Sequence, residues 1–340
     1  MRKPTVGIFC EAEFYRENSF THFIMKLCYA YCADVVAFTD KDINEKDNTI
    51  LAHYWTPDGI KSETTLMPHW VECGPYIKWH PFFRERCKIV DDCILSKKDV
   101  SDAMAKSRLS PYVIPTMYTS SPQKVFTLLS MWSAIIVKPL VGARGEDIIT
   151  IEKIADDKYV FRNTSEFIGT FNISQCIALL TKLYNGQAVI VQPKMKFTNK
   201  NGQLMDFRIN VTKGAKGNWN IIYMIARTAR DNIVSNLSKG GYASLVEPTL
   251  TTDYGNSAHK ILNTFKELAQ DIPLFMEEIS NCNMLSLGID VGIDFDTLHP
   301  YIIEVNYVPQ ITFRGKAKYA DNVAQYYAYL TNESHKENIL

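Results

Sequence analysis

The stretch YIIEVNYVPQ, residues 301–310, combines an apolar strand pattern with two polar side chains. Tyr, Ile and Val favour a pleated, half-buried strand. Residues two apart in a strand project from the same face, so Glu304 and Asn306 are predicted to lie side by side. The preceding stretch SLGIDVGID, residues 286–294, has the same strand character. We therefore expect the two stretches to pair as a hairpin.

Oxygen-bearing side chains are expected to meet on one face of this hairpin. Asp290 and Asp294 are an even number of residues apart, so they share a face of the first strand. Carboxylate and carboxamide oxygens suit a hard cation such as Mg²⁺, which proteins hold through one or two carboxylates together with phosphates and water. We predict Asp290, Glu304 and Asn306 as the metal ligands. Asp294, which begins the segment DFDTLHP, is interpreted as a turn residue.

The rest of the chain alternates strand and helix patterns, which predicts an α/β (α+β) fold. Strands are expected at 5–9, 34–38, 134–138, 147–151, 188–192, 206–213 and 218–227. Helices are expected at 20–32, 172–185, 254–270 and 317–330, with 39–49 as a polar loop. The predicted domains are 1–95, 96–193 and 194–330, followed by a frayed tail at 331–340.

Composition excludes several classes of function. Lys plus Arg and Asp plus Glu both total 37, so no net charge attracts the chain to nucleic acid or an anionic membrane. No apolar run is long enough for a membrane helix, and the N-terminal apolar stretch is too short for a signal peptide. The eight cysteines contain no CxxC pair, which argues against zinc or disulfide frameworks. The sequence therefore predicts a reduced, cytoplasmic protein with no nucleic-acid or membrane partner.

Two further stretches have the residue types of a phosphate site. In IIVKPLVGARGEDI, residues 135–148, a lysine ends an apolar strand and a turn with Gly142 and Gly145 follows. Such a turn can present backbone amides to phosphate, although a plain β-hairpin is an equal alternative. In DFRINVTK, Asp206 and Arg208 share a strand face and Arg227 follows on the next strand. These arginines fit either a bound nucleotide triphosphate or a structural salt-bridge lattice.

Taken in order, these fragments resemble the ATP-grasp superfamily. The matching pieces are Lys97, VKPLVGARG, VIVQPKM, DFR, NLSKGG, GID and EVNYVP. Within that superfamily the chain is similar to the YheC/YheD-like branch, named for endospore coat-associated proteins, with VVAFTDKDINEKDNTILAHYW (35–55) as a further match. It is also similar to the ribosomal-protein glutamate ligase and glutathione synthetase branch. The resemblance implies an ATP-grasp fold with an N-terminal Rossmann-like pre-ATP-grasp domain.

The resemblance also implies roles for individual residues. Those that match nucleotide-binding positions are Lys97, Lys138, Gly145, Gln192, Pro193, Lys194, Met195, Asp206 and Asn236. Arg208 and Arg227 match arginines that stabilise charge during transfer, and the predicted metal trio matches the family's magnesium ligands. Because Pro193 has no N–H, the hinge donor to adenine must be the amide of residue 194 or 195.

The activity implied is that of an ATP-dependent carboxylate–amine ligase that forms an amide or peptide bond through an acyl phosphate. Its cofactors would be ATP and Mg²⁺, with Mn²⁺ as the alternative metal, and its substrates a carboxylate and an amine on amino acids, peptides or small metabolites. A second hypothesis is a spore coat-associated or structural protein that retains the fold with weak or no catalysis. It is motivated by Ala143 and Asp147, which stand where the family loop has a hydroxyl residue and a glycine. The sequence is silent on oligomeric state.

Overall fold

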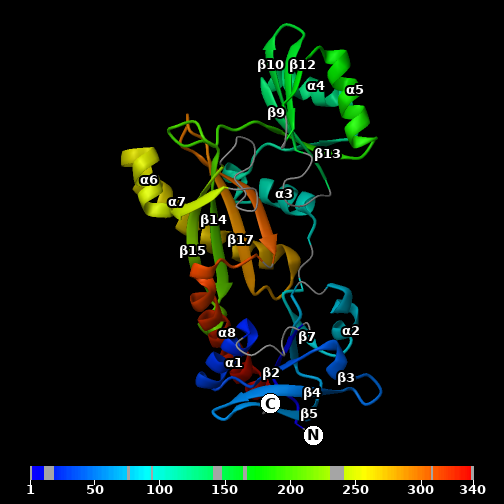
Figure 1. The fold of residues 1–340 in the computed structure, drawn as a ribbon, viewed down its shortest axis with the longest axis vertical. Helices are drawn as coiled ribbons and strands as arrows, with labels where there is room; N and C mark the ends of the chain where they lie inside the picture. Colours follow the sequence, from blue (N-terminus) through cyan, green and yellow to red (C-terminus); the bar gives the residue numbers. More distant parts are fainter. Residues whose placement is uncertain are drawn as a thin grey trace.

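Three β-sheets lie one after another along the long axis of the molecule. In Figure 1 the first sheet is at the bottom, the third in the middle and the second at the top. This computed structural model describes residues 2–10, 19–74, 77–92, 95–140, 148–163, 167–229, 241–307 and 309–337. Helices cover each sheet, so the expected mixed α/β class is confirmed. Each sheet has its own hydrophobic core, which is what lets the three sheets form separate layers.

The first sheet has the strand order β3-β4-β2-β1-β6-β7, with β5 paired to β4. The neighbouring strands β2, β1, β6 and β7 run parallel, with β7 at the edge of the sheet. The predicted strand–helix–strand unit at its start is confirmed. The β4–β5 hairpin was not predicted from the sequence. The elements are β1 (Val6–Phe9), α1 (Phe20–Ala30), β2 (Val35–Phe38), β3 (Ile43–Asn44), β4 (Thr49–Thr56), β5 (Gly59–Leu66), β6 (Trp70–Glu72), α2 (His80–Arg84) and β7 (Lys88–Val90).

The second sheet is antiparallel, with the order β12-β11-β10-β9-β13-β8. The strands expected at 134–138 and 188–192 are confirmed, as is the helix expected at 172–185. That helix ends at Asn185, whose left-handed conformation (φ 44°) stops the helical hydrogen bonds. The elements are β8 (Met117–Thr119), α4 (Pro122–Met131), β9 (Ala134–Pro139), β10 (Ile149–Ala155), β11 (Lys158–Asn163), β12 (Phe167–Phe171), α5 (Ile173–Tyr184) and β13 (Val189–Pro193).

The third sheet has the order β16-β15-β14-β17-β18 and pairs its strands antiparallel. The helix predicted at 254–270 starts later and runs to Ser280, because buried Ile272, Phe275 and Met276 continue its apolar stripe. The elements are α3 (Lys97–Ala105), β14 (Met205–Lys213), β15 (Trp219–Thr228), β16 (Tyr242–Leu245), α6 (Val246–Tyr254), α7 (Ala258–Ser280), β17 (Ser286–Ile293), β18 (Pro300–Tyr307) and α8 (Lys316–Glu337).

Two helices pack on a sheet other than the one formed by the strands next to them in the sequence. Helix α3 was grouped with the second block, yet Val100 and Met104 belong to the core of the third sheet. Helix α8 contributes Val323 and Tyr327 to the core of the first sheet and lies beside α1 (Figure 1). The prediction of a frayed tail from residue 331 is wrong through Glu337, because α8 continues to that residue and Thr331 and Ser334 are buried.

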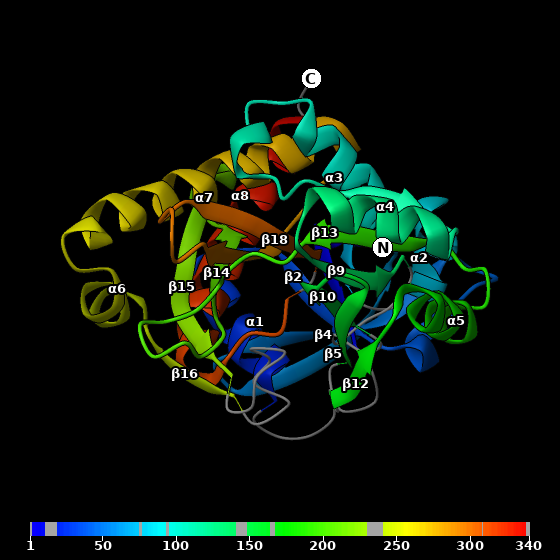
Figure 2. The ribbon, with the colours of Figure 1, turned by 90° about the horizontal axis from the view of Figure 1, so that it is seen from above.

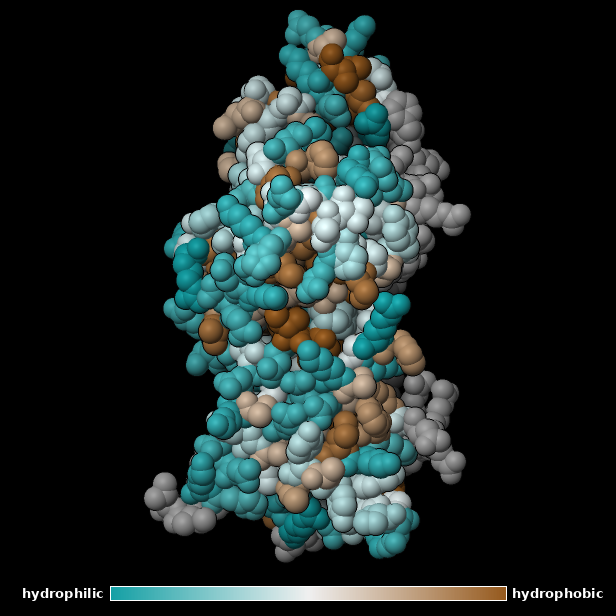
Figure 3. All heavy atoms as spheres, turned by 90° about the vertical axis from the view of Figure 1, so that its left-hand side faces the viewer, coloured by the Kyte–Doolittle hydropathy of each residue, from teal (hydrophilic) through white to brown (hydrophobic). Residues whose placement is uncertain are grey.

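The surface mixes hydrophobic and hydrophilic side chains. On the face in Figure 3, hydrophobic atoms form small areas, mostly in the middle of the molecule, separated by hydrophilic ones. Among the described residues, no helix is both long enough and apolar enough to span a bilayer.

Candidate functional site

The hairpin of β17 and β18 brings the predicted polar residues together. Asp290 lies directly opposite Glu304, and Gly288 lies opposite Asn306. The pairing shifts between Asp290 and Val291, since Val291 pairs with Ile302. Ile303 is therefore an extra residue in β18, and such a bulge re-aims the side chains next to it. The predicted hairpin is confirmed, and the irregularity sits immediately beside Glu304.

A lattice of ion pairs surrounds Asp290 on this face. Its carboxylate accepts hydrogen bonds from the Arg208 guanidinium, whose Nη2 lies 2.9 Å from Oδ2. Arg227 Nη2 lies 3.0 Å from Asp290 Oδ1. The same guanidinium donates to both oxygens of Asp206, from Nε to Oδ1 at 2.6 Å and from Nη2 to Oδ2 at 2.8 Å. Asn306 Nδ2 donates to Asp290 Oδ2 at 3.2 Å. The salt-bridge lattice considered as an alternative from the sequence is thus present.

The charged groups at the centre of this lattice are largely buried. The side chains of Arg227 and Asp290 are 11% and 9% exposed. Burial opposes the positive charge on Arg227, but the carboxylates of Asp206 and Asp290 raise its pKa well above the usual value. The guanidinium is therefore held charged and fixed in position between two carboxylates.

A second group of charges meets at Glu304. Lys97 Nζ, at the start of α3, lies 2.8 Å from Glu304 Oε1. Lys138, near the end of β9, is close enough to both groups that Glu304 raises its pKa and Lys97 lowers it. Burial is the largest influence, and the net effect is a lowered pKa for Lys138. Lys97 from α3 and Lys138 from β9 thus converge on one carboxylate.

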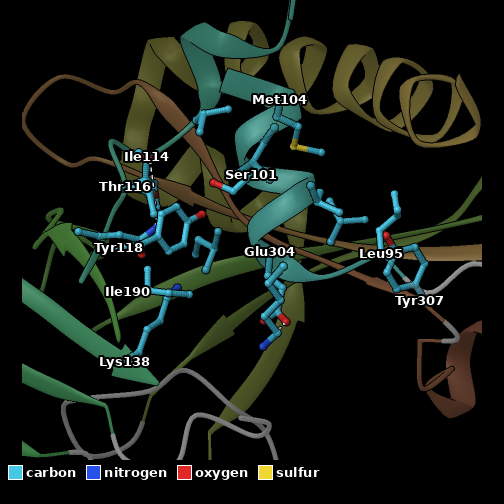
Figure 4. A pocket seen from close by; sticks show the side chains of 17 residues that line it. Leu95, Ser101, Met104, Ile114, Thr116, Tyr118, Lys138, Ile190, Glu304 and Tyr307 are labelled. Carbon is cyan, nitrogen blue, oxygen red and sulfur yellow. Dashed lines mark hydrogen bonds and ion pairs between the residues drawn. The ribbon is translucent and has the colours of Figure 1, made fainter. Parts of the chain in front are cut away.

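A cavity lies beside these lysines and is lined by residues of the second sheet, the third sheet and α3. Figure 2 shows the second-sheet strands β9 and β13 to the right of the third-sheet strands β14 and β15. Gln192 lies on its wall and donates to Thr116 Oγ1 at 2.8 Å. Figure 4 shows Glu304 and Lys138 below α3, with Ser101 and Met104 on the helix itself. The other lining residues are mostly apolar: Leu95, Val100, Val113, Ile114, Tyr118, Ile190, Ile302, Ile303, Val305 and Tyr307. An apolar cavity with a few convergent charges is typical of small-molecule sites.

The remaining predicted residues are placed less centrally. Lys194 lies outside the cavity lining, where its Nζ is 3.2 Å from Glu152 and its backbone N–H donates to Ala134 O at 2.9 Å. Pro193 ends β13, and Met195 follows Lys194. Gly145 and Asn236 fall outside the described residues, as do Ala143 and Asp147.

Asp294 has a structural role. Its carboxylate accepts hydrogen bonds from the backbone N–H groups of Lys196 and Thr297 and from the Thr297 hydroxyl. These bonds lower the pKa of Asp294 although burial opposes them. Its interpretation as a turn residue is supported. Over the described part of the chain, no three His, Cys, Asp or Glu side chains form a metal-binding group, and the predicted trio contains only two carboxylates.

Several lining residues were not predicted from the sequence. Ser101 and Met104 lie on α3, while Thr116 and Tyr118 lie near β8. Their helical or strand spacing indicates only burial. Nothing in the local sequence signals that segments near residues 100, 117, 190 and 303 meet around one cavity.

Comparison with known proteins identifies similar chains. The model of the YheC/D-like ATP-grasp family matches residues 86–332. The chain is 23% identical over 221 residues to the endospore coat-associated protein YheC of Bacillus subtilis, covering 61% of this chain and 58% of that protein. It is 23% identical over 203 residues to YheD of the same organism, covering 55% and 42%. The chain thus spans about half the length of the curated relatives it matches.

Solved structures show the same fold at low identity. The ATP-grasp ligase PsnB, complexed with a minimal precursor, has a TM-score of 0.53 and 11% identity, with coverage of 97% and 100%. D-alanyl-alanine synthetase A from Vibrio cholerae has a TM-score of 0.51 and 13% identity, with coverage of 97% of both chains. N5-carboxyaminoimidazole synthetase from Staphylococcus aureus, complexed with ADP, has a TM-score of 0.51 and 10% identity, with coverage of 96% and 77%.

Proposed function

Because this chain belongs to the YheC/D-like ATP-grasp family, we propose that it is an ATP-dependent carboxylate–amine ligase that forms an amide or peptide bond through an acyl phosphate. The observation that carries this proposal is the convergence of Lys97 and Lys138 on Glu304 in the lining of a mostly apolar cavity. The ion-pair lattice around Asp290 lies next to it across the β17–β18 pairing. The arrangement supports binding of a base in the cavity with its phosphates toward the charges.

The nucleotide would lie between the second and third sheets. Lys97 and Lys138 would bind its phosphates, together with Gly145 as the family resemblance implies. Gln192 and the segment 193–195 would form the hinge beside adenine. The Lys194 amide already donates to Ala134 O and Pro193 has no N–H. The hinge donor in this proposal is therefore the amide of Met195.

The residues expected to hold a metal have the right donor chemistry. Asp290 and Glu304 present carboxylate oxygens from adjacent strands, and Asn306 adds a carboxamide. These are the oxygen donors that Mg²⁺ or Mn²⁺ accepts together with phosphate. Asp206 and Asn236 would line the same region. A bound cation would neutralise charge on the transferring phosphoryl group.

The chemistry requires two steps in one site. A substrate carboxylate oxygen attacks the γ-phosphorus, the bond to the β-phosphate oxygen breaks, and ADP leaves. An amine nitrogen then attacks the acyl phosphate carbon, inorganic phosphate departs, and the nitrogen releases a proton to solvent. Arg208 and Arg227 are held in position by Asp290 and Asp206 and would stabilise the developing negative charge.

The carboxylate and amine are proposed as an amino acid, a peptide or a small metabolite. PsnB was solved with a minimal precursor, and a RiPP-associated ATP-grasp ligase of Chryseobacterium gregarium was solved with ADP and a leader and core peptide. Peptides therefore belong in any substrate panel. The three sheets follow the order of the proposed units 1–95, 96–193 and 194–330. Helix α3 packs on the third sheet and so connects the last two units.

A coat-associated role is the second candidate function. It is supported by the name of the two curated relatives, endospore coat-associated proteins, and by the residues at 143 and 147. In that case the fold would bind nucleotide weakly or without turnover.

Turnover in the presence of substrate separates the two. The protein would be incubated with ATP, Mg²⁺ and panels of amino acids and peptides, while ADP, phosphate and product masses are followed. Substrate-stimulated ADP with a new amide product supports the ligase. If calorimetry shows no binding of a non-hydrolysable ATP analogue, the ligase proposal is wrong. If the analogue binds but no substrate in a broad panel stimulates ADP release, the coat-associated role is favoured.

A further inference from the structure

The carboxylates proposed to bind the metal are already paired with cations of the chain itself. Glu304 is 2.8 Å from Lys97, and Asp290 is paired with both Arg208 and Arg227. Three carboxylates of the site are paired with three cations of the chain. The carboxylates belong to Asp206, Asp290 and Glu304, and the cations to Lys97, Arg208 and Arg227. Lys138 adds a fourth positive charge nearby. The site is close to neutral, or slightly positive, without any bound ion.

Adding a divalent cation alone to such a site is unfavourable. It would leave an excess of positive charge in a partly buried region, where charges are screened less than in water. A nucleotide brings several negative charges, which supply alternative partners for the lysines. The positive charge of the cation is then compensated only when the polyphosphate is bound together with it.

The two pairs differ in how easily they can separate. The side chains in the Arg227–Asp290 pair are 11% and 9% exposed and belong to a lattice with Asp206. The side chains of Lys97 and Glu304 are 47% and 32% exposed, and Nζ lies 2.8 Å from Oε1. A partly exposed ion pair is weak, so the lysine can exchange this carboxylate for a phosphate at little cost.

We propose that the Lys97–Glu304 ion pair is an exchangeable contact that blocks the metal ligand Glu304 until a polyphosphate removes Lys97. Lys97 leaves the carboxylate for the phosphates, and Glu304 then becomes available to the cation. Nucleotide and metal therefore bind with positive coupling, and by reciprocity each strengthens the binding of the other. This inference rests on the proposed function, because it assumes the same nucleotide and metal positions.

The test measures metal and nucleotide binding separately, with no turnover. Binding of Mn²⁺ alone is followed by the electron paramagnetic resonance signal of the free ion, and binding of ADP alone by calorimetry in chelator. Lys97→Met removes the ammonium while keeping a similar length. We expect it to tighten Mn²⁺ binding about fivefold, because a partly exposed pair is worth about that factor. We expect it to weaken ADP binding about tenfold, because a charge-assisted bond to phosphate is lost.

The matched control is Lys106→Met. Lys106 is exposed at the end of the same helix, so its variant should leave both affinities unchanged. Glu304→Gln is the reciprocal variant: it releases Lys97 and should tighten ADP binding in the absence of metal. Opposite changes in the two affinities of Lys97→Met support the exchange.

If Lys97→Met leaves Mn²⁺ affinity unchanged or weakens it while ADP still binds the wild type, the exchange is wrong and the proposed function stands. If the wild type binds no ADP, the proposed function fails. The Mn²⁺ measurement alone would then still decide whether Lys97 blocks Glu304.

Discussion

The carboxylate of Asp91 accepts a hydrogen bond from the backbone N–H of Leu285 at 2.8 Å, and this contact joins the end of β7 to the start of β17. The reverse bond, from the Asp91 N–H to Asn283 O, is 2.6 Å long. The first and third sheets are therefore tied together by a buried acidic residue. Burial raises the pKa of Asp91 to about 6, although hydrogen bonds from the backbone N–H groups of Leu285 and Ser286 and the charge of Lys213 lower it.

The acid pair at this junction predicts an unusual pH dependence of stability. Burial, and then the charge of Asp91, raise the pKa of Glu72 from 4.5 to about 7. Because both pKa values are higher in the folded state, folding takes up protons. The contribution of these groups to the unfolding free energy is fully present below about pH 4 and is lost as pH rises through about 6 to 7. Glu72→Gln should flatten the dependence of Tm on pH between 5 and 8 and stabilise the protein at pH 8. A slope unchanged from that of the wild type would contradict this assignment.

Removing the guanidinium of Arg227 should destabilise the fold. Arg227→Met leaves the buried carboxylates of Asp206 and Asp290 without one of their partners, and breaking a buried pair in this way costs about 3 to 5 kcal/mol. Urea denaturation measures the loss. The double variant Arg227→Met with Asp206→Asn should lose less than the sum of the single variants. Strict additivity would mean that the two residues are not coupled.

Glu304→Gln should abolish metal-dependent ATP turnover with little loss of stability. The side chain is partly exposed and its ion pair is to Lys97, so Tm should change little. Loss of one preorganised charge at the reacting centre typically lowers kcat about 10²- to 10³-fold. The measurement is ADP release with and without Mg²⁺, beside a melting curve. Undiminished turnover would contradict the assignment of Glu304 to the metal.

Filling the cavity should prevent nucleotide binding. Ser101 lines it from α3, and Ser101→Trp would place an indole ring where the base is proposed to bind. Calorimetry with ADP should show binding weakened by about a hundredfold or more, since a close steric overlap costs several kcal/mol. Ser101→Ala is the control and should bind ADP like the wild type. Normal binding by Ser101→Trp would place the nucleotide elsewhere.

Gly292 is required by the close approach of an aromatic ring. A Cβ at this position would lie 2.5 to 2.6 Å from ring carbons of Phe197. Gly292→Ala should therefore lower the unfolding free energy by about 1 to 3 kcal/mol. Adding Phe197→Leu should recover part of that loss in urea denaturation. A neutral Gly292→Ala would show that the ring moves freely aside.

The sequence alone determined the local elements and the pairing of the site strands. The apolar, strand-favouring residues of 286–294 and 301–305 indicate two strands, and the short turn between them makes an antiparallel hairpin the simplest pairing. With Glu304 and Asn306 two apart, their shared face follows from strand geometry. The order of the ATP-grasp motifs then indicated the family, which the family model matches.

Only the tertiary structure decided how these elements meet. Helix α3 follows the first sheet in sequence, but its apolar face packs on the third, which brings Lys97 to Glu304. The pairing of Arg227 with both Asp206 and Asp290 depends on the register of three strands. Helix α8, which packs against α1, likewise continues to Glu337, beyond the end at residue 330 that the sequence predicted. Such contacts join residues up to about 300 positions apart, and local periodicity carries no information about which distant surface covers an apolar face.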